Sequence, residues 1–506
     1  MISPTSVEAN GEGSDTSVVK LLSGSTVTDA DFFTAGTNFG GGNLMVSFTD
    51  AYVVGDVLNV ESGTLAVGAM QRSGNDVQYS SNNGVGKSFV INLNTNADQT
   101  NVAALLNAIS YHSTSDNPTL NNSDTSRAYS ITLNDGNNNN LAGGADEASQ
   151  TSIAVTGTIT ITPTNDAPIV DLNGATEGAA SSVTWAESSN ATHQAVTISP
   201  LATLADVDNV NFTQMQLVVS GLHNGNSEVL TIGGTVFPLD TNATNVDVGN
   251  FVVSYDTSLH AFTIIPDESG TIETLTNFQS LLQGITYNNT TDNPSVGDRT
   301  VTVSVTDAGH SDSATVSGAV TSVVATATIT VTSVNDQPVI TDVTNVSFSE
   351  NAINTTASVI DSAITLTDID SANYDGGSVT VSGLVAGQDK VALPSSPQDV
   401  LGNVKWTGVN GGAVSYYNGT AWIAIGTATG GEGNNFVVSF NSSATPAIAE
   451  RVIENLTFAN SSHNPSTVRT LTIAVNDADG GTVQTADVAV TIVRDNDAPT
   501  ISSLDV

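Results

Sequence analysis

A pair of aspartates separated by one residue recurs in register at three places along this chain, and these pairs are the residues best suited to bind an ion. Alternate residues of an extended chain point to the same side, so each pair can aim two carboxylates at one cation. Adjacent carboxylates raise each other's pKa unless a cation neutralises them, and calcium takes about six to eight oxygen ligands. The pairs therefore predict calcium binding. They are Asp29/Asp31, Asp206/Asp208 and Asp368/Asp370.

Three further elements accompany each pair in the same order. A glutamate precedes each pair by about twenty residues, an aspartate ends a later alternating strand, and an Asn-Asp-x-Pro motif closes each copy. A single aspartate is more often a turn residue than a ligand. Repetition of all four elements in one order favours a cation site. The glutamates are Glu8, Glu187 and Glu350, and the late aspartates are Asp135, Asp307 and Asp477.

The Asn-Asp-x-Pro motif divides the chain into repeats. It begins at Asn165-Asp166, Asn335-Asp336 and Asn496-Asp497, so the periods are 335 − 165 = 170 and 496 − 335 = 161 residues. Self-similarity at such periods indicates an array of modules. The sequence predicts module 1 over 1–165, module 2 over 166–335 and module 3 over 336–497, while 498–506 begin a following module or linker. We expect the chain to be a segment of a longer array.

The elements that must position these carboxylates are mostly short strands. Residues 299–305 and 469–475 alternate apolar and polar side chains, which is typical of strands with one buried face. Val102, Leu105, Leu106 and Ile109 instead follow a helical spacing, and Thr445-Pro446 is typical of a helix start before Ile448, Val452, Ile453 and Leu456. The fold class is therefore all-β, with tandem β-sandwich modules that each carry one short helix.

An arginine recurs after each predicted helix, in a chain that has few basic residues. Arg127, Arg299 and Arg469 follow the Asn-Pro dipeptides that begin at Asn117, Asn293 and Asn464. We interpret each dipeptide as a turn and each arginine as half of a structural ion pair or as a clamp on backbone carbonyls.

Composition excludes several kinds of partner and site. The formal net charge of −40 argues against nucleic acid and anionic membranes, and no apolar run is long enough for membrane insertion. The chain has no cysteine, and its six histidines are scattered without zinc-ligand spacing. It also lacks a nucleotide-binding loop and a nucleophile elbow, so we expect no enzymatic activity. Aromatic residues over 405–422 could stack on a glycan, although a hairpin with core tryptophans is the favoured interpretation.

These motifs resemble the cadherin repeat. The resemblance rests on Glu350, Asp368-Ile369-Asp370, Asp477-Ala478-Asp479-Gly480 and Asp495-Asn496-Asp497-Ala498-Pro499. It covers the module boundaries, whereas the family's central Leu-Asp-Arg-Glu segment is absent. The chain is more similar to cadherin-like tandem modules of large bacterial surface adhesins than to animal cadherins. The resemblance implies immunoglobulin/cadherin-like sandwiches with Ca²⁺ bound between successive modules.

The resemblance also implies which residues bind calcium at each junction. The first set is Glu8, Asn165, Asp166, Asp206, Asp208 and Asp307. The second set is Glu187, Asn335, Asp336, Asp368, Asp370 and Asp477. A third, at the end of module 3, is Glu350, Asp495, Asn496 and Asp497. Asn211 and Asn373 follow two of the pairs and could add oxygens.

The functional hypothesis is an extracellular or cell-surface stalk segment of an adhesin that calcium stiffens. Its partners are then calcium, neighbouring modules and a glycan or protein target outside this segment. The alternative is a self-assembling surface-layer or filament subunit, in which edge strands or calcium join chains. Oligomeric state in calcium distinguishes the two.

Overall fold

The computed structural model describes residues 4–7, 16–29, 37–50, 53–60, 68–70, 72–73, 76–77, 88–120, 123–136, 149–174, 176, 178–188, 193–267, 272–309 and 318–497. Contacts divide the chain into two compact units. Unit 1 contains Met1–Val183, Thr197–Tyr287 and Asp298–Ile329, and unit 2 contains Thr184–Val196, Asn288–Gly297 and Thr330–Val506. The module boundaries at residues 165, 335 and 497 stay a prediction.

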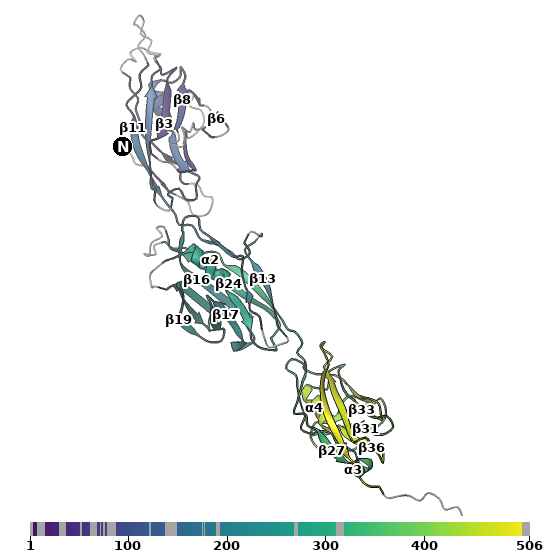
Figure 1. Ribbon diagram of the computed structural model, residues 1–506. Helices are drawn as coiled ribbons and strands as arrows, with labels where there is room; N and C mark the ends of the chain where they lie inside the picture. Colours follow the sequence, from purple (N-terminus) through teal and green to yellow (C-terminus); the bar gives the residue numbers. More distant parts are fainter. Residues whose placement is uncertain are drawn as a thin grey trace, which may run out of the picture. The chain divides into compact units, whose positions relative to one another are not determined.

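The N-terminal part of unit 1 is built from two larger sheets and a hairpin. The core between them is formed by buried side chains from Leu21 to Ile161. In spatial order, one sheet is β1 (Thr5–Val7), β11 (Val155–Thr162), β10 (Ser126–Asn134), β3 (Asn43–Phe48), β8 (Ser88–Leu93) and β5 (Gly68–Met70). The other is β2 (Val19–Lys20), β9 (Ile109–Ser113) and β4 (Asp56–Val60), and the hairpin is β6 (Arg72–Ser73) and β7 (Asp76–Val77). Figure 1 shows β3 and β8 side by side, and β10 lies between β3 and β11.

The rest of unit 1 repeats this plan with longer strands. The main sheet runs β24 (Gly297–Asp307), β16 (Asn211–Ser220), β21 (Ala261–Pro266), β20 (Phe251–Asp256) and β19 (Ala243–Val248), with β22 (Glu273–Thr274) beside β16. Smaller pairs are β12 (Ile169–Asp171) with β15 (Thr203–Ala205), and β17 (Glu228–Ile232) with β18 (Thr235–Pro238). The short helix η1 (Gly225–Ser227) precedes β17. Strands with residues in both units are β13 (Ser181–Ala186), β14 (Val196–Thr197), β23 (Thr286–Asn289), β24 and β25 (Ala325–Thr332).

Most of unit 2 is a sandwich around a core that extends from Ile353 to Ile492. The main sheet runs β27 (Val346–Ser349), β38 (Gln484–Val493), β37 (Val468–Asn476), β30 (Ser378–Ser382), β35 (Phe436–Phe440), β34 (Trp422–Gly430), β33 (Gly412–Tyr417) and β32 (Val404–Trp406). Opposite it lie β28 (Ser358–Val359), β36 (Thr457–Asn460) and β31 (Asp389–Ala392), while β26 (Val339–Thr341) pairs with β29 (Thr365–Thr367). The predicted hairpin over 405–422 is confirmed, and Trp406 is buried in the core. The prediction of a second core tryptophan is wrong, because Trp422 is half-buried and donates from Nε1 to Asp399 over 2.7 Å at the surface.

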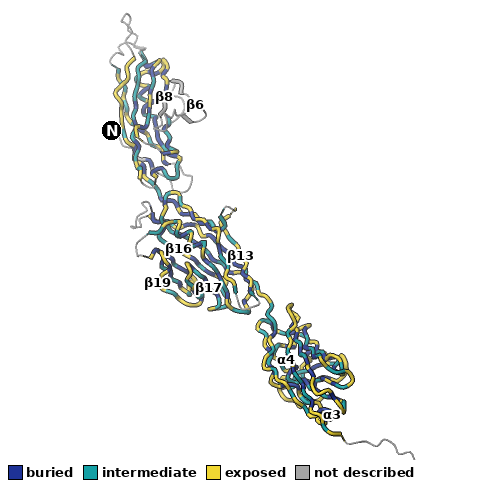
Figure 2. Tube along the Cα trace, viewed as in Figure 1, coloured by how far each residue is buried: buried dark blue, intermediate teal, exposed yellow. Residues whose placement is uncertain are grey.

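The predicted alternation of buried and exposed side chains is confirmed. In β24 every second residue from Arg299 to Asp307 is buried, and β16 alternates in the same way from Met215 to Ser220 (Figure 2). Because Arg299 and Asp307 lie 307 − 299 = 8 positions apart, an even number, both lie on the buried face. One strand therefore carries an arginine into the core at one end and an aspartate toward the linker at the other.

The predicted helical spacing extended too far at two ends, since Ile109 begins β9 and Leu456 lies beyond the helix that ends at Glu454. The three helices are otherwise present as predicted, and their apolar stripes face the core. They are α1 (Gln99–Leu106), α2 (Leu275–Gln283) and α4 (Pro446–Glu454), with N-caps at Asp98, Thr274 and Thr445. Phe278 of α2 packs on Phe212 of β16 and Phe251 of β20, with ring centroids 6.0 and 4.8 Å apart, and Figure 1 shows α2 beside β16. No helix in the described part of the chain is long and apolar enough to cross a membrane.

One further helix differs from the prediction of a single helix per module. α3 spans Glu350–Thr355 and follows β27 directly. Its six residues are too few to show an apolar period, which is why the sequence pattern did not reveal it. Glu350 lies in its first turn, where a carboxylate is favoured by the helix dipole.

The three recurrent arginines form buried ion pairs, as predicted. Each guanidinium Nε binds a carboxylate oxygen at 2.5–2.6 Å, and these carboxylates are equally buried. Arg127 also donates to the Pro118 carbonyl, so both predicted roles are combined there. The carboxylate partners were not predicted. The pairs are Arg127–Asp56, Arg299–Glu228 and Arg469–Asp389.

Candidate metal centres

The asparagine of each of the first two linker motifs is hydrogen-bonded to the late aspartate that lies 142 residues further along the chain. Asn165 donates from Nδ2 to Asp307 Oδ2 over 2.9 Å, and Asn335 donates to Asp477 Oδ2 over 3.1 Å. Asp307 is fully buried and also accepts the backbone N–H groups of Gly309 and Val320. Burial raises the pKa of Asp307. Both aspartates were predicted as ligands, and the structure shows them anchoring the linkers.

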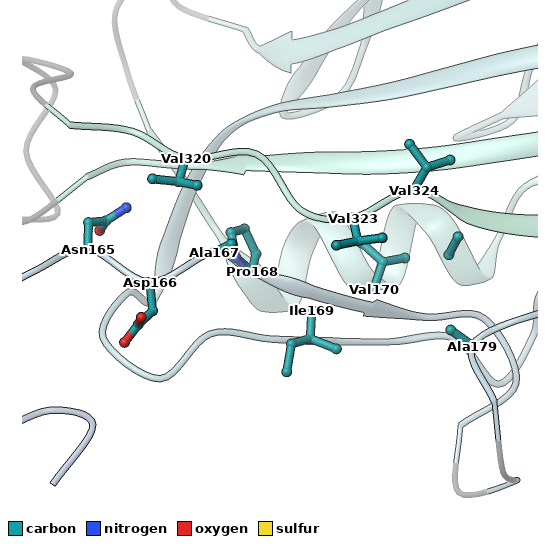
Figure 3. A pocket seen from close by; sticks show the side chains of 11 residues that line it. Asn165, Asp166, Ala167, Pro168, Ile169, Val170, Ala179, Val320, Val323 and Val324 are labelled. Carbon is teal, nitrogen blue, oxygen red and sulfur yellow. The ribbon is translucent and has the colours of Figure 1, made fainter. Parts of the chain in front are cut away.

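In the first linker, the Asp166 side chain points away from the Asn165 side chain (Figure 3). Figure 3 shows the side chains of Asn165 and Asp166 on opposite sides of the chain, beside a pocket whose far wall includes Val323 and Val324. The backbone N–H of Asp166 donates to Asp208 Oδ2 over 3.3 Å, and that of Asp336 donates to Asp370 Oδ2 over 3.0 Å. Each linker is therefore tied to the second aspartate of an Asp-x-Asp pair.

Carboxylates and amides crowd together around Asp206. Its Oδ1 accepts the backbone N–H groups of Asp208 and Asn209, at 3.1 and 2.9 Å. The Asn209 amide donates to Asn165 Oδ1 over 2.7 Å and to Asp208 Oδ1 over 2.9 Å. Burial, and then the neighbouring Asp208, raise the pKa of Asp206 to about 8. Among the described residues, Asp206 Oδ2 and Asn209 Oδ1 are buried without a hydrogen-bond partner.

Asn209, rather than the predicted Asn211, is therefore the asparagine that lies beside the Asp206/Asp208 pair. Asn209 is 1% exposed and lies one residue after the aspartate pair, whereas Asn211 begins β16. Glu8 and Asp31 fall outside the described residues, so the structure gives no geometry for either.

The second linker is surrounded by a denser cluster. Ligand atoms of Glu187, Asp292 and Asp336 all lie within 4.8 Å of one another. Glu187 follows β13 and accepts the Val334 N–H through Oε2 over 3.0 Å. Asp292 lies in the turn after β23, and its Oδ1 is 3.1 Å from His193 Nε2. Three segments that are distant in sequence thus meet at one point.

Four carboxylate oxygens of this second cluster are buried and have no hydrogen-bond partner in the described part of the chain. They belong to Glu187, Asp336, Asp368 and Asp370. Burial raises the pKa of Glu187, of Asp336 and of Asp370, and neighbouring carboxylates raise each further. Buried anions without partners are costly, and a bound cation removes that cost. This all-oxygen set fits calcium, whose ligands are carboxylates, carbonyls and water.

A third cluster follows β38. Ligand atoms of Glu350, His463 and Asp497 lie within 4.8 Å of one another. Glu350 accepts the Asp495 N–H through Oε2 over 3.1 Å, as Glu187 accepts the Val334 N–H. Asp495 itself accepts from Ser349 Oγ and the Asn351 N–H at the start of α3. The hydrogen bond from Ser349, and then that from Asn351, lower the pKa of Asp495. Of the predicted third set, the structure brings Glu350 and Asp497 together at this cluster.

Sequence reasoning missed the residue that precedes each Asn-Pro dipeptide. Asp292 and His463 occupy this position in the second and third clusters, and Asp116 occupies it in the first copy. The dipeptides were interpreted only as turns. Their asparagines also reach the Asp-x-Asp loops: Asn117 Nδ2 donates to the Val207 carbonyl and Asn293 Nδ2 to the Ile369 carbonyl, each over 3.0 Å. The sequence feature that could have revealed these residues was the recurrence of Asp, Asp and His directly before Asn-Pro.

Comparisons with known proteins give weak structural similarities. No protein-family model matches the sequence, and no curated protein sequence is significantly similar to it. Drosophila N-cadherin EC1-4 aligns at 9% identity over 92% of this chain and 72% of that chain, with a TM-score of 0.16. Human protocadherin-24 EC1-2 aligns at 14% identity over 66% and 100%, with a TM-score of 0.21. A biofilm-associated protein BSP domain aligns at 9% identity over 98% and 67%, with a TM-score of 0.17. The fold class rests on the strands themselves, since TM-scores this low carry no further argument.

Proposed function

We propose that this chain is a non-enzymatic stalk segment of an extracellular or cell-surface adhesin, and that calcium at its linkers stiffens it. The observation that carries the proposal is that four carboxylate oxygens, on Glu187, Asp336, Asp368 and Asp370, are buried and have no hydrogen-bond partner among the described residues. Calcium would supply the charge that these oxygens lack. The coordinating groups would be Glu187, Asp292, Asp336 and the Asp368/Asp370 pair.

Stiffening follows from where these residues are attached. Glu187 follows a sheet strand, Asp292 lies in the turn after β23, and Asp336 lies in the linker itself. An ion that all three chelate fixes the linker to two folded segments, so the linker loses backbone freedom. Extracellular modules bind calcium with Kd values of about 10⁻⁴–10⁻³ M, which suits a protein that encounters calcium outside the cell.

Calcium titration of matched variants tests the proposal. We expect the wild-type chain to bind calcium by isothermal titration calorimetry, and Asp336→Asn to weaken the second site at least about tenfold, or about 1.4 kcal/mol. Asp247→Asn is the matched control, because Asp247 is exposed on β19 and makes the same change of charge. Equal affinities in Asp336→Asn and the wild type would remove the linker from the site.

Small-angle X-ray scattering then tests whether calcium stiffens the chain. In about 5 mM calcium, above the weakest affinities expected, we expect a monomer whose distance distribution is narrower than in chelator. An unchanged distribution would contradict stiffening. Growth of molecular mass with calcium would instead favour a self-assembling layer or filament subunit.

A further inference from the structure

The third cluster differs from the second by one chemical substitution at a corresponding position. Each contains an early glutamate, the residue before Asn-Pro and the linker aspartate. In the second cluster the middle residue is Asp292, whereas in the third it is His463. A nitrogen ligand therefore replaces a carboxylate oxygen, and the formal charge of the trio changes from −3 to −2.

The third trio is a built site rather than a group of surface acids. Glu350 is 1% exposed, and its Oε1 is buried without a hydrogen-bond partner among the described residues. Its Oε2 is fixed by the Asp495 N–H. His463 and Asp497 reach the same place from the exposed side, with His463 Nδ1 3.2 Å from Asp497 Oδ2. One buried oxygen with no other partner thus faces an imidazole and a second carboxylate.

This donor set favours a different cation from the second site. Calcium prefers oxygen, while imidazole nitrogen suits zinc, cobalt, nickel and copper. Two ligands on a tetrahedral ion with bonds of about 2.0 Å lie about 3.3 Å apart, close to the His463–Asp497 separation. The exposure of His463 also leaves room for water to complete the coordination sphere.

We propose that Glu350, His463 and Asp497 bind a divalent transition-metal cation of the zinc class. The inference rests on the proposed function, because it assigns a second cation class to one of the linker sites. Histidine spacing along the sequence does not predict such a site, since it uses a single histidine and two carboxylates from distant segments.

Cobalt(II) is the probe, because it substitutes for zinc and its visible absorption reports nitrogen and oxygen ligation. The full chain is freed of metal with chelator, returned to about 5 mM calcium to fill the oxygen sites, and titrated with cobalt(II). We expect one site that His463→Asp weakens at least about tenfold, with loss of its visible absorption. Glu350→Gln, which keeps the side chain's shape, is expected to weaken the same site.

His193→Gln is the matched control, because His193 is the histidine beside the Asp292 carboxylate of the second cluster. Its cobalt titration is expected to equal that of the wild type. Cobalt binding that is unchanged in His463→Asp, or that is lost only in His193→Gln, would overturn the inference and leave His463 as an ion-pair partner of Asp497. Absence of cobalt binding would also overturn it. Calcium titrations of the same variants report separately on the proposed function.

Discussion

Replacing Arg299 with methionine is expected to lower the free energy of unfolding of its module by about 3–5 kcal/mol. Arg299 and Glu228 are both fully buried, with Nε and Oε1 2.6 Å apart. The same carboxylate accepts the Tyr287 hydroxyl and the N–H groups of His223 and Asn224. Burial alone would raise the pKa of Glu228, but the Asn224 N–H, Arg299 and the other donors lower it. Without Arg299, a buried carboxylate would lose its only cationic partner of those described.

Hydrogen–deuterium exchange on peptides that cover β16 and β24 measures this effect within the module that contains Arg299. Arg299→Met should raise their exchange and lower the urea midpoint. The matched control is Lys390→Met, which breaks the exposed pair with Glu432 and should leave the urea midpoint nearly unchanged, because solvent screens that pair. The double variant Arg299→Met/Glu228→Gln should recover part of the loss, because no buried charge remains. Equal stability of Arg299→Met and the wild type would show that the pair is not required.

Lowering the pH from about 8 to about 5 is expected to stabilise the calcium-free chain. Burial and Asp208 raise the pKa of Asp206 from its ordinary value of 3.8 to about 8. Between these values the folded state binds more protons than the unfolded state, so stability falls as pH rises. Because Asp206 is partly exposed, screening reduces the full linkage energy, and we expect a Tm gain of roughly 2–8 °C, or about 1–2 kcal/mol. Calcium should reverse the trend, since it binds the ionised carboxylates.

Differential scanning calorimetry in chelator, at several pH values, tests this linkage. Asp206→Asn should be more stable than the wild type at pH 8 in chelator and should show a weaker dependence on pH. Asp247→Asn, the exposed control, should follow the wild type. A calcium-free chain whose Tm rises from pH 5 to pH 8 would contradict the assigned direction of the Asp206 pKa.

The arginine ion pairs show what a local sequence pattern can predict and what it cannot. The recurrence of Arg127, Arg299 and Arg469 predicted a structural ion pair in each copy. Their partners were not predictable, because they lie 71, 71 and 80 residues earlier and differ in type. β4, β17 and β31 lie in different sheets from the strands that carry the arginines, so the packing of one sheet on the other brings the partners together. No local spacing encodes that packing. The helix α3 was missed for a different reason, since six residues are too few for a helical period.

Side-chain type and short-range period were enough to predict the all-β class, the alternating strands, the three longer helices and most of the acidic residues at the linkers. Long-range packing fixed which acids lie together. Glu187, Asp292 and Asp336 are separated by 292 − 187 = 105 and 336 − 292 = 44 residues, yet their ligand atoms lie within 4.8 Å. The same packing places Asp307 as the anchor of a linker and His463 beside two carboxylates. A local pattern does not encode this, because burial and the loss of water partners arise from contacts between distant segments, which make one repeated acid a hydrogen-bond anchor and another a candidate cation ligand.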